Sequence, residues 1–300
     1  MTETDSTSSS KYRRLLCPVD FSDISRRALE WTLSFSKELQ ASVTLLHVID
    51  SRMTSVGNLV NIPDVSHELR QRADGMLHEW QRVLNLSRVK IEIREGVPDQ
   101  EVVNATREAP VDLLIMGTHG FGGFQRLLLG SVTEKVLHRV RVPLMTISQA
   151  SALEPSKRPT RVVTAVDLGA ESSEVVRHGL FLARHFAVSL VAAHVLPVPD
   201  VVLNYRTVEQ LGAEELARLT KRITEERRKE LEQLMSHATD VDVEIETAVG
   251  RPYAILTGLV RDTDLLVMGA GGHGEAALGW LGSVCHKMVR SAPCPVLIVR

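Results

Sequence analysis

The chain has 300 residues, a length typical of two domains of ordinary size. Its 35 Lys and Arg residues are mixed with 37 Asp and Glu residues, and only 4% of the chain is aromatic. This composition argues against a nucleic-acid partner, which needs a basic stripe or an aromatic stacking platform. No apolar run approaches the roughly 18 residues that a membrane-spanning helix requires, so we expect no membrane partner.

The three cysteines and the N-terminal residues indicate the cellular compartment of the protein. Cys17, Cys285 and Cys294 have no metal-ligand spacing and do not form an even-numbered set, which favours a reducing, cytoplasmic setting. Residues 1–11 open with the polar run MTETDSTSSS, which predicts a disordered N-terminal tail and not a signal peptide.

The first half alternates short apolar strands with amphipathic helices. The pattern predicts strands at 14–19, 43–48, 89–93, 112–116 and 144–147, and helices that begin at Ser22, near Val65, near Val102 and at Ser131. Such alternation favours a parallel, doubly wound α/β sheet. Ligands of these sheets bind at the carboxyl ends of the strands, near the switch in strand order.

The second half repeats this plan. Asp167 follows a strand just as Asp20 does 147 residues earlier, and His194-Val195 follows His47-Val48 at the same offset. The repeat predicts two doubly wound, Rossmann-like nucleotide-binding domains in tandem, at 12–148 and 160–300, with a linker at 149–159. A long helix is predicted at 207–237, and its charged stretch at 225–230 indicates a salt-bridged surface.

A glycine-rich loop recurs with constant spacing in both halves. Each loop has the form Gly, two residues, Gly, nine residues, Gly-Ser, which gives Gly117, Gly120, Gly130, Ser131 and Gly269, Gly272, Gly282, Ser283. Glycine lets phosphate oxygens approach backbone N–H groups, and the following helix start adds unpaired donors and a positive dipole end. One such loop can be an ordinary strand-to-helix turn, but two with identical spacing favour a phosphate site.

The helix starts and the loop contents differ between the halves. Ser131 with Glu134 predicts a capping box, in which the serine is the N-cap. Thr118-His119 becomes Ala270-Gly271 in the second half, which loses a hydroxyl and an imidazole. A looser loop costs more entropy to order, so we expect weaker ligand binding there.

On these residues the chain resembles a tandem universal stress protein over 12–148 and 160–300. The glycine spacing resembles that family's ATP-binding signature. The resemblance implies that ATP is the ligand, with a requirement for Mg²⁺ left open. It also implies pairing of the closing strands, Val142–Met145 and Cys294–Leu297, so the two halves could form a pseudo-dimer, and a homodimer of whole chains stays open.

The resemblance also implies a set of nucleotide-binding residues. The glycines and serines of both loops match positions that contact phosphate and ribose. Asp20 and Asp167 match an acidic residue near the nucleoside, where a carboxylate can accept hydrogen bonds from ribose hydroxyls, although a helix cap would explain each aspartate as well. The backbones of Val48 and Val195 match the position that reads adenine. The remaining candidates for nucleotide contact are His119, Val132 and Val284.

Three functions remain open: a regulatory ATP-binding module in stress response, a slow ATPase or phosphotransferase, and a stress-linked scaffold or chaperone-like protein with empty pockets. A Walker-type loop would place Lys directly after its last glycine, whereas Ser131 and Ser283 stand there. Lys135 and Lys287 lie one helical turn further on. We assign no catalytic and no metal-ligating residue, and expect binding more than turnover, with slow hydrolysis left open.

Overall fold

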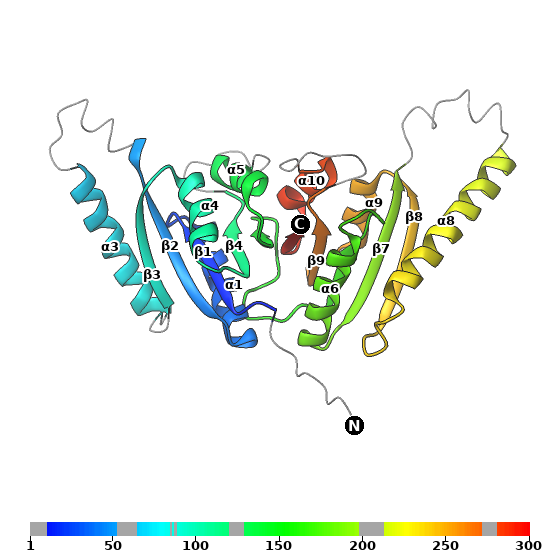
Figure 1. Cartoon of the computed structure of the whole chain (residues 1–300), viewed down its shortest axis with the longest axis horizontal. Helices are drawn as coiled ribbons and strands as arrows, with labels where there is room; N and C mark the ends of the chain where they lie inside the picture. The colour runs from blue at the N-terminus through cyan, green and yellow to red at the C-terminus, as the bar shows by residue number, and fades with distance from the viewer. Residues whose placement is uncertain are drawn as a thin grey trace. The chain divides into compact units, whose positions relative to one another are not determined.

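The computed structural model describes residues 11–52, 65–84, 86, 89–119, 129–197, 213–271 and 281–300. The chain divides into two compact units, Met1–Ile147 and Ser148–Arg300. Each unit contains a parallel sheet whose strands alternate with helices along the chain, which confirms the predicted fold class (Figure 1).

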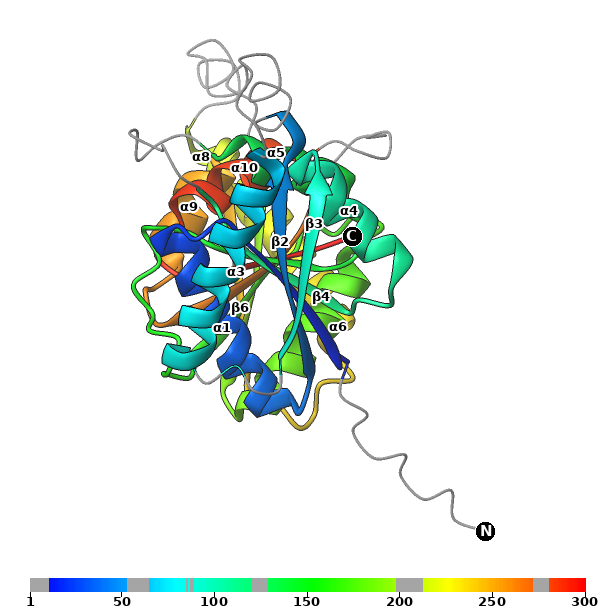
Figure 2. The ribbon, with the colours of Figure 1, turned by 90° about the vertical axis from the view of Figure 1, so that its left-hand side faces the viewer.

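The first unit has a parallel sheet in the order β3-β2-β1-β4-β5. Its elements are β1 Arg14–Val19, α1 Asp23–Leu39, β2 Ser42–Asp50, α3 Val65–Leu84, β3 Val89–Gly96, α4 Pro98–Glu108, β4 Leu113–Gly117, α5 Ser131–Arg139 and β5 Leu144–Ile147. Figure 2 shows α1 and α3 on one side of this sheet and α4 on the other, and α5 packs against α4.

The second unit repeats the order as β8-β7-β6-β9-β10, again with parallel strands. Its elements are β6 Arg161–Ala165, α6 Ser172–Phe186, β7 Ser189–Pro197, α8 Ala213–Met235, β8 Val243–Gly250, α9 Pro252–Leu259, β9 Asp264–Gly269, α10 Ser283–Ser291 and β10 Val296–Val299. The helix predicted at 207–237 is α8, and residues 207–212 lie outside the described part of the chain. Ion pairs such as Arg227–Glu230 confirm its charged surface.

The strand order switches at the centre of each sheet. In the first unit the chain runs from β1 outward to β2 and β3, and then returns to β4 on the other side of β1. Both central strands are buried, with Leu16 and Leu114 at most 2% exposed. A crevice for ligands is therefore expected at the carboxyl ends of β1 and β4, and at those of β6 and β9.

The predicted cap of α5 is wrong by one residue. The N-cap is Gly130, whose backbone is extended, and it makes no side-chain cap bond, so Ser131 is the first helical residue. The reason is a backbone bond of 2.8 Å from Gly130 N to Thr118 O, which fixes Gly130 in place before the helix begins. The capping box with Glu134 does not form, and the exposed Ser131 hydroxyl is not used to cap the helix.

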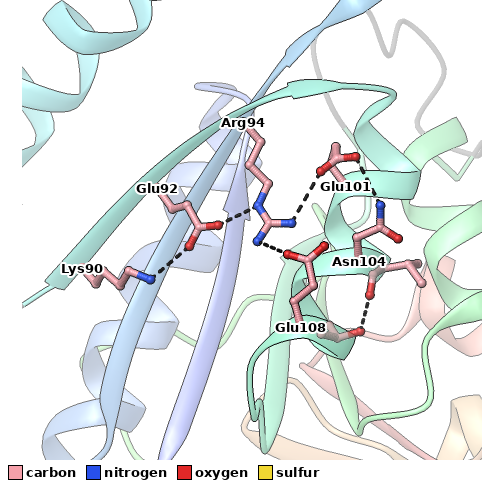
Figure 3. A network of polar contacts seen from close by, with 8 residues as sticks. Lys90, Glu92, Arg94, Glu101, Asn104 and Glu108 are labelled. Atoms are coloured by element: carbon pink, nitrogen blue, oxygen red, sulfur yellow. Dashed lines mark hydrogen bonds and ion pairs between the residues drawn. The ribbon is translucent and has the colours of Figure 1, made fainter.

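An ionic network joins β3 to α4 in the first unit (Figure 3). The Arg94 side chain is 18% exposed and contacts Glu92 at 2.6 Å, Glu108 at 2.9 Å and Glu101 at 3.5 Å. Desolvation lowers the pKa of Arg94, but its bonds and charge interactions with Glu92 and Glu108 raise the pKa more, so the net shift is upward. The single positive charge of Arg94 is thus shared among three carboxylates.

We expect Arg94→Ala to destabilise the first unit by roughly 2 kcal/mol, because Glu101 and Glu108 would lose the cation that they contact and Glu92 would keep only the exposed Lys90. Lys90→Ala is the matched control. Lys90 contacts Glu92 at 3.2 Å but is 71% exposed, so its loss should cost less than about 0.5 kcal/mol. Hydrogen exchange of peptides from β2 and β3 measures both effects, and equal protection in the two variants would contradict this account.

Candidate functional site

The turn from β1 to α1 is organised by Asp20. Its Oδ1 accepts hydrogen bonds from Ser22 N at 3.1 Å and from Ser22 Oγ at 2.5 Å. Ser22, where the helix was predicted to begin, is the N-cap of α1, and its Oγ accepts from Ser25 N. Phe21, between Asp20 and Ser22, has a φ of 66°. This left-handed conformation costs a non-glycine residue about 1 kcal/mol or more. Asp20 therefore orients the cap residue and is not itself the cap.

The second unit builds the same turn from different residues. Asp167 Oδ1 accepts from Gly169 N at 2.9 Å and from Ser172 Oγ at 3.0 Å. Leu168 has a φ of 60°, which matches the conformation of Phe21. The N-cap of α6 is Glu171, which makes no side-chain cap bond. Asp167 is therefore no helix cap either, and both aspartates stand at the carboxyl end of the first strand of their unit.

Each glycine loop is closed at its base by backbone hydrogen bonds. In the first unit Thr118 N donates to Ile147 O at 3.0 Å, and Thr118 O accepts from Gly130 N at 2.8 Å. In the second, Ala270 makes the same two bonds, to Val299 O at 2.9 Å and from Gly282 N at 2.8 Å. In each unit these bonds thus hold the start of the following helix close to the end of the fourth strand. Residues Gly120 and Gly272 lie outside the described residues, so their predicted roles are not tested.

Gly117 joins the loop to the β1–α1 turn. A Cβ atom on Gly117 would lie 3.2 Å from the backbone carbon of Ile24 in α1, which is closer than ordinary side-chain packing allows. Gly117 therefore lets the start of α1 pack against the end of β4. This contact brings the turn of Asp20 and the base of the glycine loop to one crevice.

Val48 and Val195 lie level with the two aspartates. In the parallel register Val19 of β1 pairs with His47 of β2, and Asp20 and Val48 are the residues that follow this last pair. Asp167 and Val195 follow the same register in β6 and β7. Each aspartate thus follows the central strand of its unit, and each valine lies on the strand beside it, on the side away from the glycine loop.

An aromatic cluster beside Asp20 was not predicted from the sequence. The Phe21 ring lies 4.5 Å from the His47 ring and 5.3 Å from the Trp80 ring, measured between centroids. The second unit has Leu168 in place of Phe21. The sequence held one signal, an aromatic residue directly after the strand-end aspartate, but the contact with Trp80 depends on how α3 packs.

The first loop also carries a buried polar pair. Thr118 is fully buried and His119 is 8% exposed, and Thr118 Oγ1 lies 2.8 Å from His119 Nδ1. Their counterparts, Ala270 and Gly271, cannot form such a bond. The change from Thr118-His119 to Ala270-Gly271 therefore removes one side-chain hydrogen bond from the base of the second loop.

The rings of His47 and His194 each form a hydrogen bond with a backbone carbonyl. His47 Nδ1 lies 2.9 Å from Val19 O, and His194 Nδ1 lies 2.8 Å from Val166 O. A carbonyl oxygen only accepts, so Nδ1 carries the proton in both rings. Burial lowers the pKa of His47, although the bond to Val19 and the charge of Asp20 oppose this shift.

The lowered pKa of His47 predicts a loss of stability in acid. The unfolded chain takes up a proton at the ordinary pKa of about 6.5, before the folded state does, so stability falls as the pH drops below that value. We expect His47→Asn to lose less free energy of unfolding than wild type between pH 7.5 and pH 5.5. Urea unfolding at the two pH values measures this, and equal losses in both proteins would contradict the assignment.

The lysines that follow the loops contact side chains of other helices, and the cysteines are buried. Lys135 Nζ lies 3.5 Å from Asp99 Oδ1 of α4, and Lys287 Nζ lies 5.5 Å from the centre of the Tyr253 ring of α9. All three cysteines are buried, and burial raises the pKa of Cys17 and Cys285 to about 12. These thiols are therefore poor nucleophiles. Within the described ranges no group of three or more His, Cys, Asp or Glu side chains could hold a metal ion.

A doubly wound parallel sheet with a glycine loop at its switch point defines a class of α/β domain, and this chain carries two of them. The family model described as the universal stress protein family matches residues 11–148 and 159–300. The chain belongs to that family and contains its domain in tandem. None of the described helices is long and apolar enough to cross a membrane.

Individual relatives agree with this assignment. A universal stress protein of Mycolicibacterium smegmatis is 26% identical over 299 residues, which covers 95% of this chain and 96% of that protein. Universal stress protein MJ0531 of Methanocaldococcus jannaschii is 31% identical over 146 residues, or 46% of this chain and 83% of the relative. A crystal structure of a universal stress protein from Archaeoglobus fulgidus superposes with a TM-score of 0.66 at 22% identity, covering 98% and 99% of the two chains, which shows the common fold.

Proposed function

We propose that the first unit binds ATP in the crevice between the carboxyl ends of β1 and β4, and acts as a regulatory nucleotide-binding module in stress response. One observation carries the proposal. The base of the glycine loop, the start of α5 and the turn of Asp20 meet at the switch in strand order, because Gly117 lets α1 pack against β4.

The phosphates would lie at the start of α5. The first N–H groups of that helix, from Ser131 and Val132, have no intrahelical acceptor and stand at the positive end of the helix dipole. The N-cap residue, Gly130, has no side chain with which to cap them. The exposed Ser131 hydroxyl can add a further donor to a phosphate oxygen, since it does not serve the helix.

The nucleoside would lie toward β2. Asp20 is exposed and stands level with Val48, so its carboxylate can accept from ribose hydroxyls while the Val48 backbone faces adenine. The rings of Phe21 and His47 supply apolar surface beside them. Mg²⁺, when present, would bridge the phosphate oxygens, with most of its ligands from ATP and water.

Binding without fast turnover is the expected activity. Lys135 is turned toward Asp99, and the cysteines near the loops are protonated at neutral pH. Little is left among the described residues to stabilise charge on a transferring phosphoryl group. His119 is the acid–base candidate nearest the loop.

Titration calorimetry with ATP, paired with an assay for released phosphate, tests the proposal. We expect a saturable isotherm and no phosphate release beyond the rate of the uncatalysed reaction. Rapid phosphate release would replace the proposal by the ATPase function. A flat isotherm with and without Mg²⁺ would contradict it and favour the scaffold function.

A further inference from the structure

The start of α6 differs from the start of α1 at one position that faces the glycine loop. Ile24 and Glu171 are equivalent residues, separated by the 147-residue offset that relates the two halves. Ile24 packs against Gly117 at the end of β4, whereas Glu171 Oε2 lies 3.3 Å from the Cβ position of Gly269 at the end of β9. An apolar contact in the first unit is therefore a carboxylate in the second.

The Glu171 carboxylate also reaches the loop itself. Glu171 Oε2 lies 3.5 Å from the Cβ position of Gly271, the residue after the loop base. The Cβ position of Gly282, the N-cap of α10, lies 3.1 Å from Gly271 O. The carboxylate thus stands beside Gly271, and the backbone of Gly271 in turn packs against Gly282 at the start of α10.

The charge of Glu171 acts on the first turn of α10. Burial raises the pKa of Cys285, the third residue of that helix, to about 12; the charge of Arg300 lowers it and the charge of Glu171 raises it. Burial lowers the pKa of Arg300, which follows β10, while the charges of Cys285 and Glu171 raise it. The charges of Glu171 and Arg300 therefore both act on the surroundings of Cys285.

We propose that Glu171 closes the second glycine loop to ATP, so that the chain binds one nucleotide, in its first unit. The inference rests on the function proposed for that unit. A carboxylate near the helix start repels a polyphosphate. This repulsion should weaken ATP binding in the second unit by at least about tenfold. The apolar Ile24 exerts no such repulsion in the first unit.

Glu171→Ile, which copies the first unit, and the uncharged isostere Glu171→Gln test the proposal. Glu171 has helical backbone angles and makes no side-chain cap bond, so both variants should fold. Each is made alone and together with Ser131→Asp, which silences the first site, and the probe is ATP in EDTA. We expect native mass spectrometry to count one nucleotide on wild type and two on each Glu171 variant, and one on each double variant.

The outcomes separate this inference from the proposed function. Two equally tight ATP molecules on wild type, or one on Glu171→Ile, would overturn the inference and leave the first site standing. No ATP on wild type but one on Glu171→Ile would support the inference and contradict the first site. No ATP on any protein would contradict both. A second ATP that binds wild type only with Mg²⁺, and is lost in Glu171→Ile, would also overturn the inference about Glu171.

Discussion

Ser131→Asp is expected to lower the ATP affinity of the first unit by about 100-fold while the protein becomes slightly more stable. The two effects have opposite signs because both come from the start of α5. A carboxylate there interacts favourably with the helix dipole, by about 0.3–1 kcal/mol. The same carboxylate repels the phosphates, and a 100-fold loss corresponds to about 2.7 kcal/mol of binding free energy.

Titration calorimetry and urea unfolding of the same preparation measure both quantities. Ala254→Asp is the matched control, since it adds the same charge to the first turn of α9, which has no acidic residue and follows the edge strand β8. It should change stability in the same direction and leave ATP affinity unchanged. Weaker binding in both variants would point to a general effect of charge, and unchanged binding in Ser131→Asp would contradict the phosphate site.

Gly179→Ala is expected to destabilise the second unit by about 3 kcal/mol, although alanine favours helices over glycine. Gly179 lies in the interior of α6, and a Cβ atom there would overlap Cγ2 of Thr164 in β6 and lie 3.3 Å from Leu190 Cδ1. Thr164 is fully buried, and its hydroxyl donates to Val191 O at 3.2 Å, which limits how far it can move. Hydrogen exchange of β6 and β7 peptides measures the loss.

A second substitution provides the rescue for this variant. The atom that overlaps the new Cβ is Cγ2 of Thr164, and serine lacks that atom while it keeps the hydroxyl that donates to Val191 O. We expect Gly179→Ala combined with Thr164→Ser to recover most of the stability, while β1 and β2 peptides stay unchanged throughout. A double variant as unstable as Gly179→Ala would contradict the size-compensation argument.

Most of the fold could be predicted because its signals are local. The structure assigns β1 to the predicted residues, and α1 begins at Asp23, one residue after the predicted start at Ser22. Strands β2 and β3 run further than predicted, because their ladder continues to the pair Asp50 and Gly96, where the sequence is no longer apolar. Pairing with a neighbouring strand, and not side-chain pattern, sets those ends.

The candidate site was predicted less completely, because it depends on contacts between distant segments. The sequence pointed to Asp20 and Gly117, and the structure brings their turns together. The sequence did not reveal that Gly130 is the N-cap of α5. The Gly130 N–H donates a hydrogen bond to Thr118 O, which is distant in the sequence. Nor did the sequence reveal Glu171, whose position matters only because α6 starts beside the second loop.

Native mass spectrometry of freshly purified protein tests the central claim most directly, with release and identification of any bound small molecule. The account predicts one adenine nucleotide per chain, or uptake of one ATP by protein that was purified empty. It predicts that Ser131→Asp removes that nucleotide. A chain that carries no nucleotide and takes up none from ATP with Mg²⁺ would contradict the claim, and the glycine loops would then serve only as strand-to-helix turns.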